Sequence, residues 1–211
     1  MVCSRPDLSW VVTKLSQNLS KPRNGDWVMV KHVLQYVKGT LNKKLIYRKC
    51  NTVDLHGFSD SDWAGSKTDR RSTTGYCFML NRMGPPVSWK SRKQTTVALS
   101  SCEAEYMALC DATKEAKFLD MLLNDFLPDV SFRPIRIHVD NTGAIALGKN
   151  NMVTKRSKHI DIRYHFTREC FNDGLIDILH VDSEENIADI FTKPLGRPKY
   201  QYFGRVLFGE Q

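Results

Sequence analysis

Long apolar runs are missing from this sequence of 211 residues. A membrane-spanning helix needs about 18 or more consecutive apolar residues, and no such stretch occurs. The first ten residues, MVCSRPDLSW, also lack the basic segment followed by an apolar one that marks a signal peptide. We therefore expect no membrane partner and an intracellular protein, with cytoplasm and nucleus both left open.

The six cysteines lack any grouping that would give them a structural task. None forms a CxxC pair or a finger-like arrangement with histidine, which argues against structural zinc and against the disulfide framework of a small secreted protein. We expect buried or free thiols and no disulfide-linked partner.

The composition is that of an ordinary globular protein, with 41% hydrophobic and 26% charged residues. The length suits one domain with a small appendage. Lys and Arg number 31 and Asp and Glu 23, which gives a formal net charge of +8. This surplus favours a polyanionic partner such as nucleic acid, although many basic enzymes bind none.

The order of helix and strand patterns predicts an α/β fold. Residues 1–50 carry two short helical patterns separated by the breaker run 21–25, and form the first predicted unit, a helical hairpin. In the second unit, 51–211, three strand patterns at 55–60, 75–80 and 87–89 precede a long helix, which Ser100 and Glu103 open as a capping box and Pro128 ends. There follow a strand at 135–140, helices near 142–148 and 158–171, a strand at 175–181, and a last helix around 187–191 capped by Ser183. We predict a mixed sheet flanked by helices.

Glu105 lies on the apolar face of the long helix. On a helical wheel it falls within about 40° of positions 109, 112, 116, 119 and 123, and the apolar stripe continues to Phe126. A buried carboxylate costs several kcal/mol unless it is paired or bound to a metal. The pattern leaves two interpretations open, a metal ligand and half of an ion pair with a buried arginine.

Asp60 and Asp140 each end a strand pattern. If these strands are parallel neighbours, the acids lie about 4.8 Å apart at the edge where α/β sheets bind ligands. Carboxylates at that spacing can hold two divalent ions that clamp the attacking and leaving oxygens of a phosphodiester, and oxygen ligands suit Mg²⁺ or Mn²⁺. A turn-forming role for each aspartate is the alternative.

Asp189 and two basic clusters have less decisive patterns. Periodicity does not orient Asp189 on its helix, so the alternative of a solvated acid stays open. The clusters are candidates for binding nucleic-acid phosphates, with an ordinary solvated surface as the alternative. They are Lys90, Arg92 and Lys93 after Trp89, and Lys155, Arg156 and Lys158 before a predicted helix.

Five segments carry a combined resemblance that none would carry alone. They are FSDSDWAGSKTDRRSTTGYCFML (58–80), PVSWKSRKQTTVALSSCEAEYMAL (86–109), IHVDNTGAIAL (137–147), KRSKHIDIRYHFTRE (155–169) and ENIADIFTKPL (185–195). In this order they resemble the ribonuclease H domain of copia-type LTR retrotransposon polyproteins. Residues 4–40 are similar to the segment that joins reverse transcriptase to ribonuclease H in those polyproteins, so the first unit would be a remnant of that connection.

The resemblance implies a five-stranded mixed sheet, with its first and fourth strands adjacent and parallel. It places the family's four metal-binding acids on Asp60, Glu105, Asp140 and Asp189. The implied activity is endonucleolytic cleavage of the RNA strand of RNA·DNA hybrids with two Mg²⁺ or Mn²⁺ ions, and the implied partners are the hybrid and the reverse transcriptase portion of a polyprotein. Many cellular ribonucleases H carry a histidine-bearing loop before the last acid, whereas His180 here ends a strand pattern, which argues against help from histidine.

Polymerisation is not expected, because the sequence lacks a Tyr-x-Asp-Asp motif, and it also lacks a P-loop and the HHCC zinc module of integrases. Two alternatives to the ribonuclease stay open, a catalytically idle nucleic-acid-binding or assembly module and a nuclease that cuts DNA with the same acids. The sequence also leaves open whether the chain is a fragment, a degraded insertion or a host-retained gene.

Overall fold

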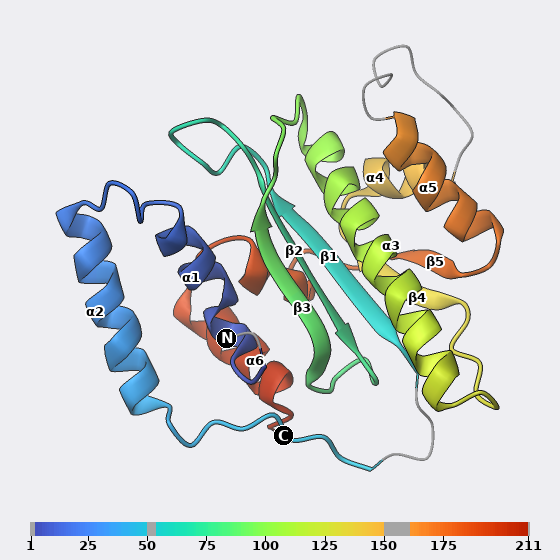
Figure 1. Ribbon diagram of the computed structural model, residues 1–211, viewed down its shortest axis with the longest axis horizontal. Coiled ribbons are helices and arrows are strands. Elements are labelled where there is room, and N and C mark those ends of the chain that lie inside the picture. The colour runs from blue at the N-terminus through green and yellow to red at the C-terminus, as the bar shows by residue number, and fades with distance from the viewer. Residues whose placement is uncertain (1–2, 50–53, 150–160, 211) are drawn as a thin grey trace.

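A five-stranded mixed sheet in the order β3-β2-β1-β4-β5 forms the centre of the computed structural model, which describes residues 3–49, 54–149 and 161–210 (Figure 1). The strands are β1 (His56–Asp62), β2 (Thr73–Met79), β3 (Pro86–Lys93), β4 (Ile135–Val139) and β5 (Ile176–His180). The first three form the predicted antiparallel meander, and β1 runs parallel to β4 and β4 to β5. The predicted fold class is confirmed, including the adjacent and parallel first and fourth strands.

Helices cover both faces of the sheet. On one face lie α3 (Ser101–Phe126), α4 (Thr142–Lys149) and α5 (Asp161–Asn172), and on the other the 3-10 helix η3 (Ile187–Phe191) and α6 (Arg197–Phe208). The N-terminal elements η1 (Pro6–Leu8), α1 (Ser9–Ser16) and α2 (Asn24–Gly39) lie beside the β3 edge (Figure 1). There the Thr13 hydroxyl donates a hydrogen bond of 3.1 Å to the backbone oxygen of Ser91 on β3. The predicted helical hairpin is present, and the division of the chain into two domains stays a prediction.

Each face of the sheet has its own hydrophobic core. Phe78, Tyr106 and Ile137 belong to the core under α3, and Phe58 and Phe203 belong to the core under η3 and α6. Burying a side chain of this size contributes about 1.5 to 3 kcal/mol, so the sheet is stabilised from both sides.

The long helix α3 begins as the sequence predicts. The backbone N–H of Glu103 donates to the Ser100 hydroxyl at 3.2 Å, and the Glu103 carboxylate accepts from the backbone N–H of Leu99 at 2.9 Å. These contacts satisfy donors that an uncapped helix would leave free. The prediction that Phe126 continues the buried stripe is wrong, because this last turn of α3 extends beyond the sheet and leaves Phe126 exposed.

The C-terminal part differs most from the prediction. Residues 187–191 form a short 3-10 helix whose cap is Asn186, which accepts from the backbone N–H of Ala188 at 3.2 Å, and Ser183 does not cap it. The sequence patterns also missed α6, whose apolar residues pack against the second core.

Two strands are longer than predicted. β1 continues to Asp62 because Ser61 and Asp62 still pair with β2 after β4 has ended. β3 continues to Lys93 because it keeps pairing with β2 as far as Thr73. Lys90, Arg92 and Lys93 therefore lie on an edge strand.

No helix within the described ranges is both long and apolar enough to cross a lipid bilayer. The five described cysteines are free, and three of them are buried: Cys77, Cys110 and Cys170.

Candidate metal centre

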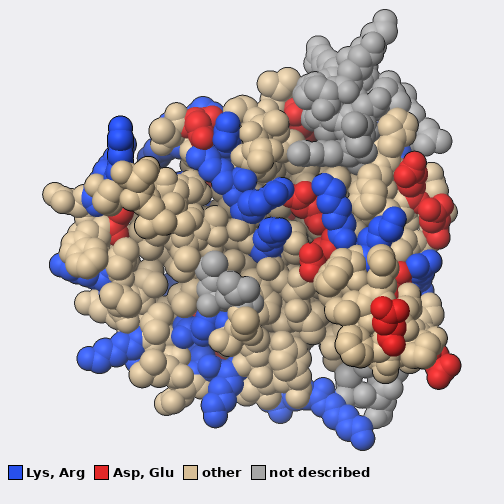
Figure 2. Space-filling model, viewed as in Figure 1, with Lys and Arg blue, Asp and Glu red and all other residues tan. Residues whose placement is uncertain are grey.

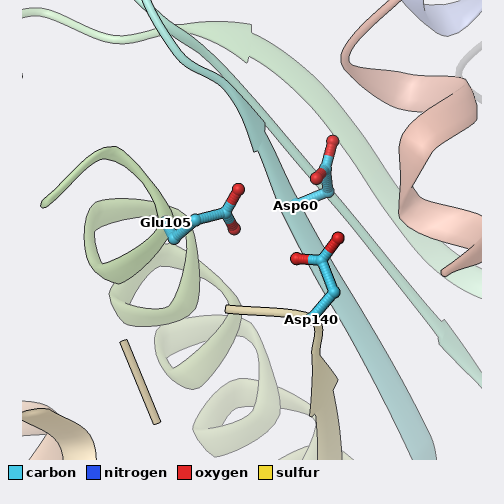
Figure 3. Close-up of side chains that lie close together, drawn as sticks. All are labelled: Asp60, Glu105 and Asp140. Atoms are coloured by element: carbon cyan, nitrogen blue, oxygen red, sulfur yellow. The ribbon is translucent and has the colours of Figure 1, made fainter. Parts of the chain in front are cut away.

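Three carboxylates from three different elements converge beside the C-terminal end of β4. Asp60 comes from β1, Glu105 from the start of α3 and Asp140 from the residue after β4, and in Figure 3 they point toward one another. One oxygen of each lies within 4.8 Å of the others. Asp60 is 2% and Glu105 6% exposed, and Asp140 is partly exposed. The structure thus brings together three of the four acids that the sequence predicts for the site.

The register between β1 and β4 places the two aspartates side by side. Phe58 lies opposite His138 in this parallel pair, and side chains two residues further along project from the same face of the sheet. Asp60 and Asp140 are those residues. The turn-forming alternative for Asp60 is wrong, because Asp60 lies inside β1 and pairs with Gly75 of β2.

Glu105 has one oxygen in a hydrogen bond and one without a partner. Its Oε1 accepts from the backbone N–H of Ser61 at 3.2 Å, and its Oε2 is buried with no hydrogen-bond partner. Within the described part of the chain no lysine or arginine forms an ion pair with Glu105, so the predicted alternative of a buried arginine partner finds no support there. Burial, followed by the charges of Asp60 and Asp140, raises the pKa of Glu105 well above its usual value.

The two aspartates are held by hydroxyl groups. Thr192 donates a short hydrogen bond to Asp60 Oδ2, and Ser183 donates one of 2.8 Å to Asp140 Oδ2. Burial and the charge of Asp189 raise the pKa of Asp60 to about 7, against the opposing effects of Lys193 and the Thr192 hydrogen bond. The site therefore favours protonated acids unless more positive charge is added.

The residues present fit a divalent cation. All three groups offer carboxylate oxygens, the ligands that Mg²⁺ and Mn²⁺ prefer. The buried and unpartnered Oε2 of Glu105 is an acceptor that a cation would satisfy.

Asp189, the fourth predicted acid, lies outside this triad. It is 1% exposed, so the alternative of a solvated acid is wrong. Its Oδ1 lies 2.6 Å from Lys193 Nζ and its Oδ2 lies 3.1 Å from Lys199 Nζ. Since Lys193 Nζ is also 3.7 Å from Asp60 Oδ2, its ammonium group is shared by Asp60 and Asp189.

A glycine allows η3 to approach the triad this closely. A Cβ atom on Gly75, which lies opposite Asp60, would come within 2.6 Å of Thr192 Cγ2 and 2.8 Å of Phe191 Cβ. Asn186 fixes the other end of η3 by donating to the backbone oxygen of Ser59 at 3.0 Å. Only glycine at position 75 leaves room for Thr192 beside Asp60.

Sequence reasoning missed three polar residues of the site: Gln94, Thr192 and Lys193. Gln94 is buried and its Nε2 donates to Thr74 Oγ1 and to the backbone oxygen of Ala104, both at 3.0 Å, which ties β2 to the start of α3. Thr192 and Lys193 follow Asp189 by three and four residues, a spacing that could have indicated contact with it. Gln94 gave no such signal, because its partners are far apart in the sequence.

The first basic cluster lies on the edge strand. Lys90 is exposed, Arg92 forms an ion pair with Asp111, and Lys93 Nζ lies 2.9 Å from Asp69 Oδ2. Figure 2 shows Lys and Arg side chains gathered near the end of β3. Lys155, Arg156 and Lys158, the second cluster, lie outside the described residues.

Comparisons with known proteins agree with this geometry. The chain is similar to the "Retrovirus-related Pol polyprotein from transposon RE2" of Arabidopsis thaliana, with 40% identity over 97% of this chain and 14% of the relative. It is also similar to the corresponding polyprotein from transposon TNT 1-94 of Nicotiana tabacum, with 37% identity over 95% of this chain and 15% of the relative. The chain thus spans about one seventh of these relatives' length. No protein-family model matches.

Among solved structures, the N-terminal RNase H domain of rv2228c from Mycobacterium tuberculosis, solved as a fusion with maltose-binding protein, has the same fold. The TM-score is 0.50 at 12% identity, over 73% of this chain and 98% of that chain. At this identity the likeness concerns the fold alone.

Proposed function

Because the chain belongs to the retrovirus-related Pol polyproteins of Ty1/copia-type transposons, we propose that it is a Mg²⁺-dependent ribonuclease H that cleaves the RNA strand of RNA·DNA hybrids. The observation that carries the proposal is the buried triad of Asp60, Glu105 and Asp140, with its unpartnered Glu105 oxygen. The ribonuclease H fold is consistent with it.

Asp60, Glu105 and Asp140 would hold the first ion. Bound divalent ions stabilise the charge that develops on the attacking and leaving oxygens of a phosphodiester. The protein's part is to fix the ligands, and it does so through the hydroxyl groups of Thr192 and Ser183 and the backbone N–H of Ser61. Because these donors keep the carboxylates in place, little reorganisation would accompany ion binding.

A second ion would need the other side of Asp60. Asp60 and Asp189 are the acids available there, and the ammonium group of Lys193 now contacts both. A two-metal mechanism therefore requires Lys193 to move away from Asp60 and Asp189 before a second ion can bind between them. Lys199 would keep its contact with the second oxygen of Asp189.

Substrate binding is assigned to the basic surface. Phosphate contacts position a duplex without reading its sequence, and contacts to the 2′-hydroxyl distinguish RNA from DNA. The candidates for phosphate contacts are Lys90, Arg92, Lys93, Lys155, Arg156 and Lys158. Arg92 and Lys93 would exchange their present carboxylate partners for phosphates.

A second candidate function is a nucleic-acid-binding or assembly module without turnover. The observation that favours it is the pairing of Asp189 with Lys193 and Lys199, which leaves three acids rather than four in the cluster. The complete polyprotein's activities, including any action beside a reverse transcriptase, are likewise a proposal for this chain.

One assay with three substrates separates these functions. We expect the protein to cleave a labelled RNA·DNA hybrid in Mg²⁺ or Mn²⁺ and to leave DNA and RNA duplexes intact. Equal cleavage of the DNA duplex would indicate a DNA-directed nuclease. Hybrid binding without cleavage at saturating Mg²⁺ would favour the idle module.

A further inference from the structure

The C-terminal half of α3 carries a large apolar surface on its outer side. Phe118 is 56%, Met121 62% and Phe126 73% exposed. Three neighbouring side chains, Leu122, Leu127 and Val130, are also exposed. In Figure 1 this end of α3 faces the viewer with no other element drawn over it, and in the same view of Figure 2 the surface there is mostly neither basic nor acidic.

The size of this patch calls for a partner. Six large side chains at about half exposure present roughly 500 Å² of apolar surface, which is at the upper end of what a monomer leaves open to water. The patch is opposite the face of α3 that packs on the sheet, so it adds nothing to the core of this chain.

The charges beside the patch are ordered so that a second copy fits it. On the helical wheel Lys114 and Asp125 lie within about 40° of Phe118, on the same side of α3. Both side chains are exposed. The basic residue is nearer the N-terminus of the helix and the acidic one nearer the C-terminus. The surface is therefore complementary to itself when a second helix runs in the opposite direction.

One register satisfies both the charges and the apolar groups. If two α3 helices cross antiparallel about a two-fold axis between positions 119 and 120, Lys114 lies opposite Asp125 of the other copy. The same axis places Phe118 opposite Met121 of the other copy. A parallel arrangement would instead bring like charges together, which disfavours it.

We propose that this face of α3, centred on Phe118, Met121, Lys114 and Asp125, is the interface of an antiparallel homodimer. Glu105 lies in the first half of α3 and points toward the sheet, so the dimer leaves the acidic triad accessible. The proposal does not depend on the assigned nuclease activity.

Sedimentation equilibrium of the whole chain, from about 1 to about 200 µM, tests it. We expect a dimer with a dissociation constant on the order of 10 µM, as suits an interface of modest size. Lys114→Glu and Asp125→Lys should each weaken the dimer about tenfold, or 1.4 kcal/mol shared by two symmetry-related pairs. The double variant should restore the affinity to within about threefold of the wild type, because each reversed charge again faces its opposite.

Two further variants act as controls for the apolar contact. Phe118→Gln should weaken the dimer, whereas Leu34→Gln, which changes an exposed apolar residue on α2, should not. Circular dichroism would verify that all variants fold. A protein that stays monomeric at the highest concentration overturns the proposal, and so does a dimer that the single reversals leave unchanged or the double variant fails to restore.

Discussion

Replacing Glu105 by glutamine removes one charge from the acidic triad while keeping the shape of the side chain. The amide oxygen of the glutamine can still accept the hydrogen bond from Ser61 N–H. Two carboxylates whose oxygens lie within 4.8 Å repel each other by roughly 3 kcal/mol at an effective dielectric constant near 20. Partial protonation already relieves some of this repulsion, since the pKa of Glu105 is raised. We therefore expect the metal-free Glu105→Gln variant to be more stable than the wild type by about 1 to 2 kcal/mol.

The same change should remove the stabilisation that Mg²⁺ gives to the fold. An ion at about one hundred times its dissociation constant stabilises the native state by about 2.7 kcal/mol. For a chain of this length that corresponds to a rise in Tm of roughly 5 to 10 °C. The wild type should show this rise and Glu105→Gln should not. Thermal unfolding with and without Mg²⁺, followed by circular dichroism near neutral pH, measures both effects.

Glu103→Gln is the matched control. It makes the same chemical change two residues earlier on the same helix, where the carboxylate caps α3 and is outside the triad. Its response to Mg²⁺ should equal that of the wild type. If Glu105 were half of a buried ion pair, Glu105→Gln would instead lose about 3 to 5 kcal/mol with no dependence on Mg²⁺. That result would refute the assignment of Glu105 as a ligand.

Three more predictions concern the aspartate, the glycine and the basic residues. Because the pKa of Asp60 rises from 3.8 to about 7 on folding, its contribution to metal-free stability is present below about pH 4 and is lost as the pH rises to about 7; melts should show a slope in this range that Asp60→Asn reduces, and equal slopes would contradict it. Gly75→Ala should cost about 1 to 3 kcal/mol in chemical denaturation and weaken Mg²⁺ binding, because its Cβ would press on Thr192, whereas Gly25→Ala, with nothing within 4 Å, should be neutral or stabilising. Changing the second basic cluster to alanine should weaken hybrid binding and lower the slope of log affinity against log salt by about 0.9 per phosphate contact, with cleavage at saturating substrate near wild type, and an unchanged slope would assign the cluster to ordinary solvated surface. This cluster is Lys155, Arg156 and Lys158.

The acids of the triad could be found from the sequence because each depends on a local pattern. Glu105 lies on the apolar face of a helix whose period is plain, and Asp140 ends an alternating strand. The placement of Asp60 beside Asp140 needed one further assumption, the parallel pairing of their strands, which the register confirms.

The rest of the site depends on contacts between distant segments. Asp189 is buried because Gly75, on the far side of the sheet sequence, lets η3 approach β1 and β2. Lys193 acquires its role from Asp60 as well as from Asp189, and the first of these contacts has no counterpart in helical spacing. Tertiary packing decided these positions, and periodicity in one segment could not predict them.

The central claim is that Asp60, Glu105 and Asp140 form the metal site of a ribonuclease H. Its most direct test compares the wild type with the double variant Asp60→Asn and Asp140→Asn on a labelled RNA·DNA hybrid in Mg²⁺. The account predicts RNA-strand cleavage by the wild type and none above background by the folded double variant. Cleavage that survives both substitutions would contradict it.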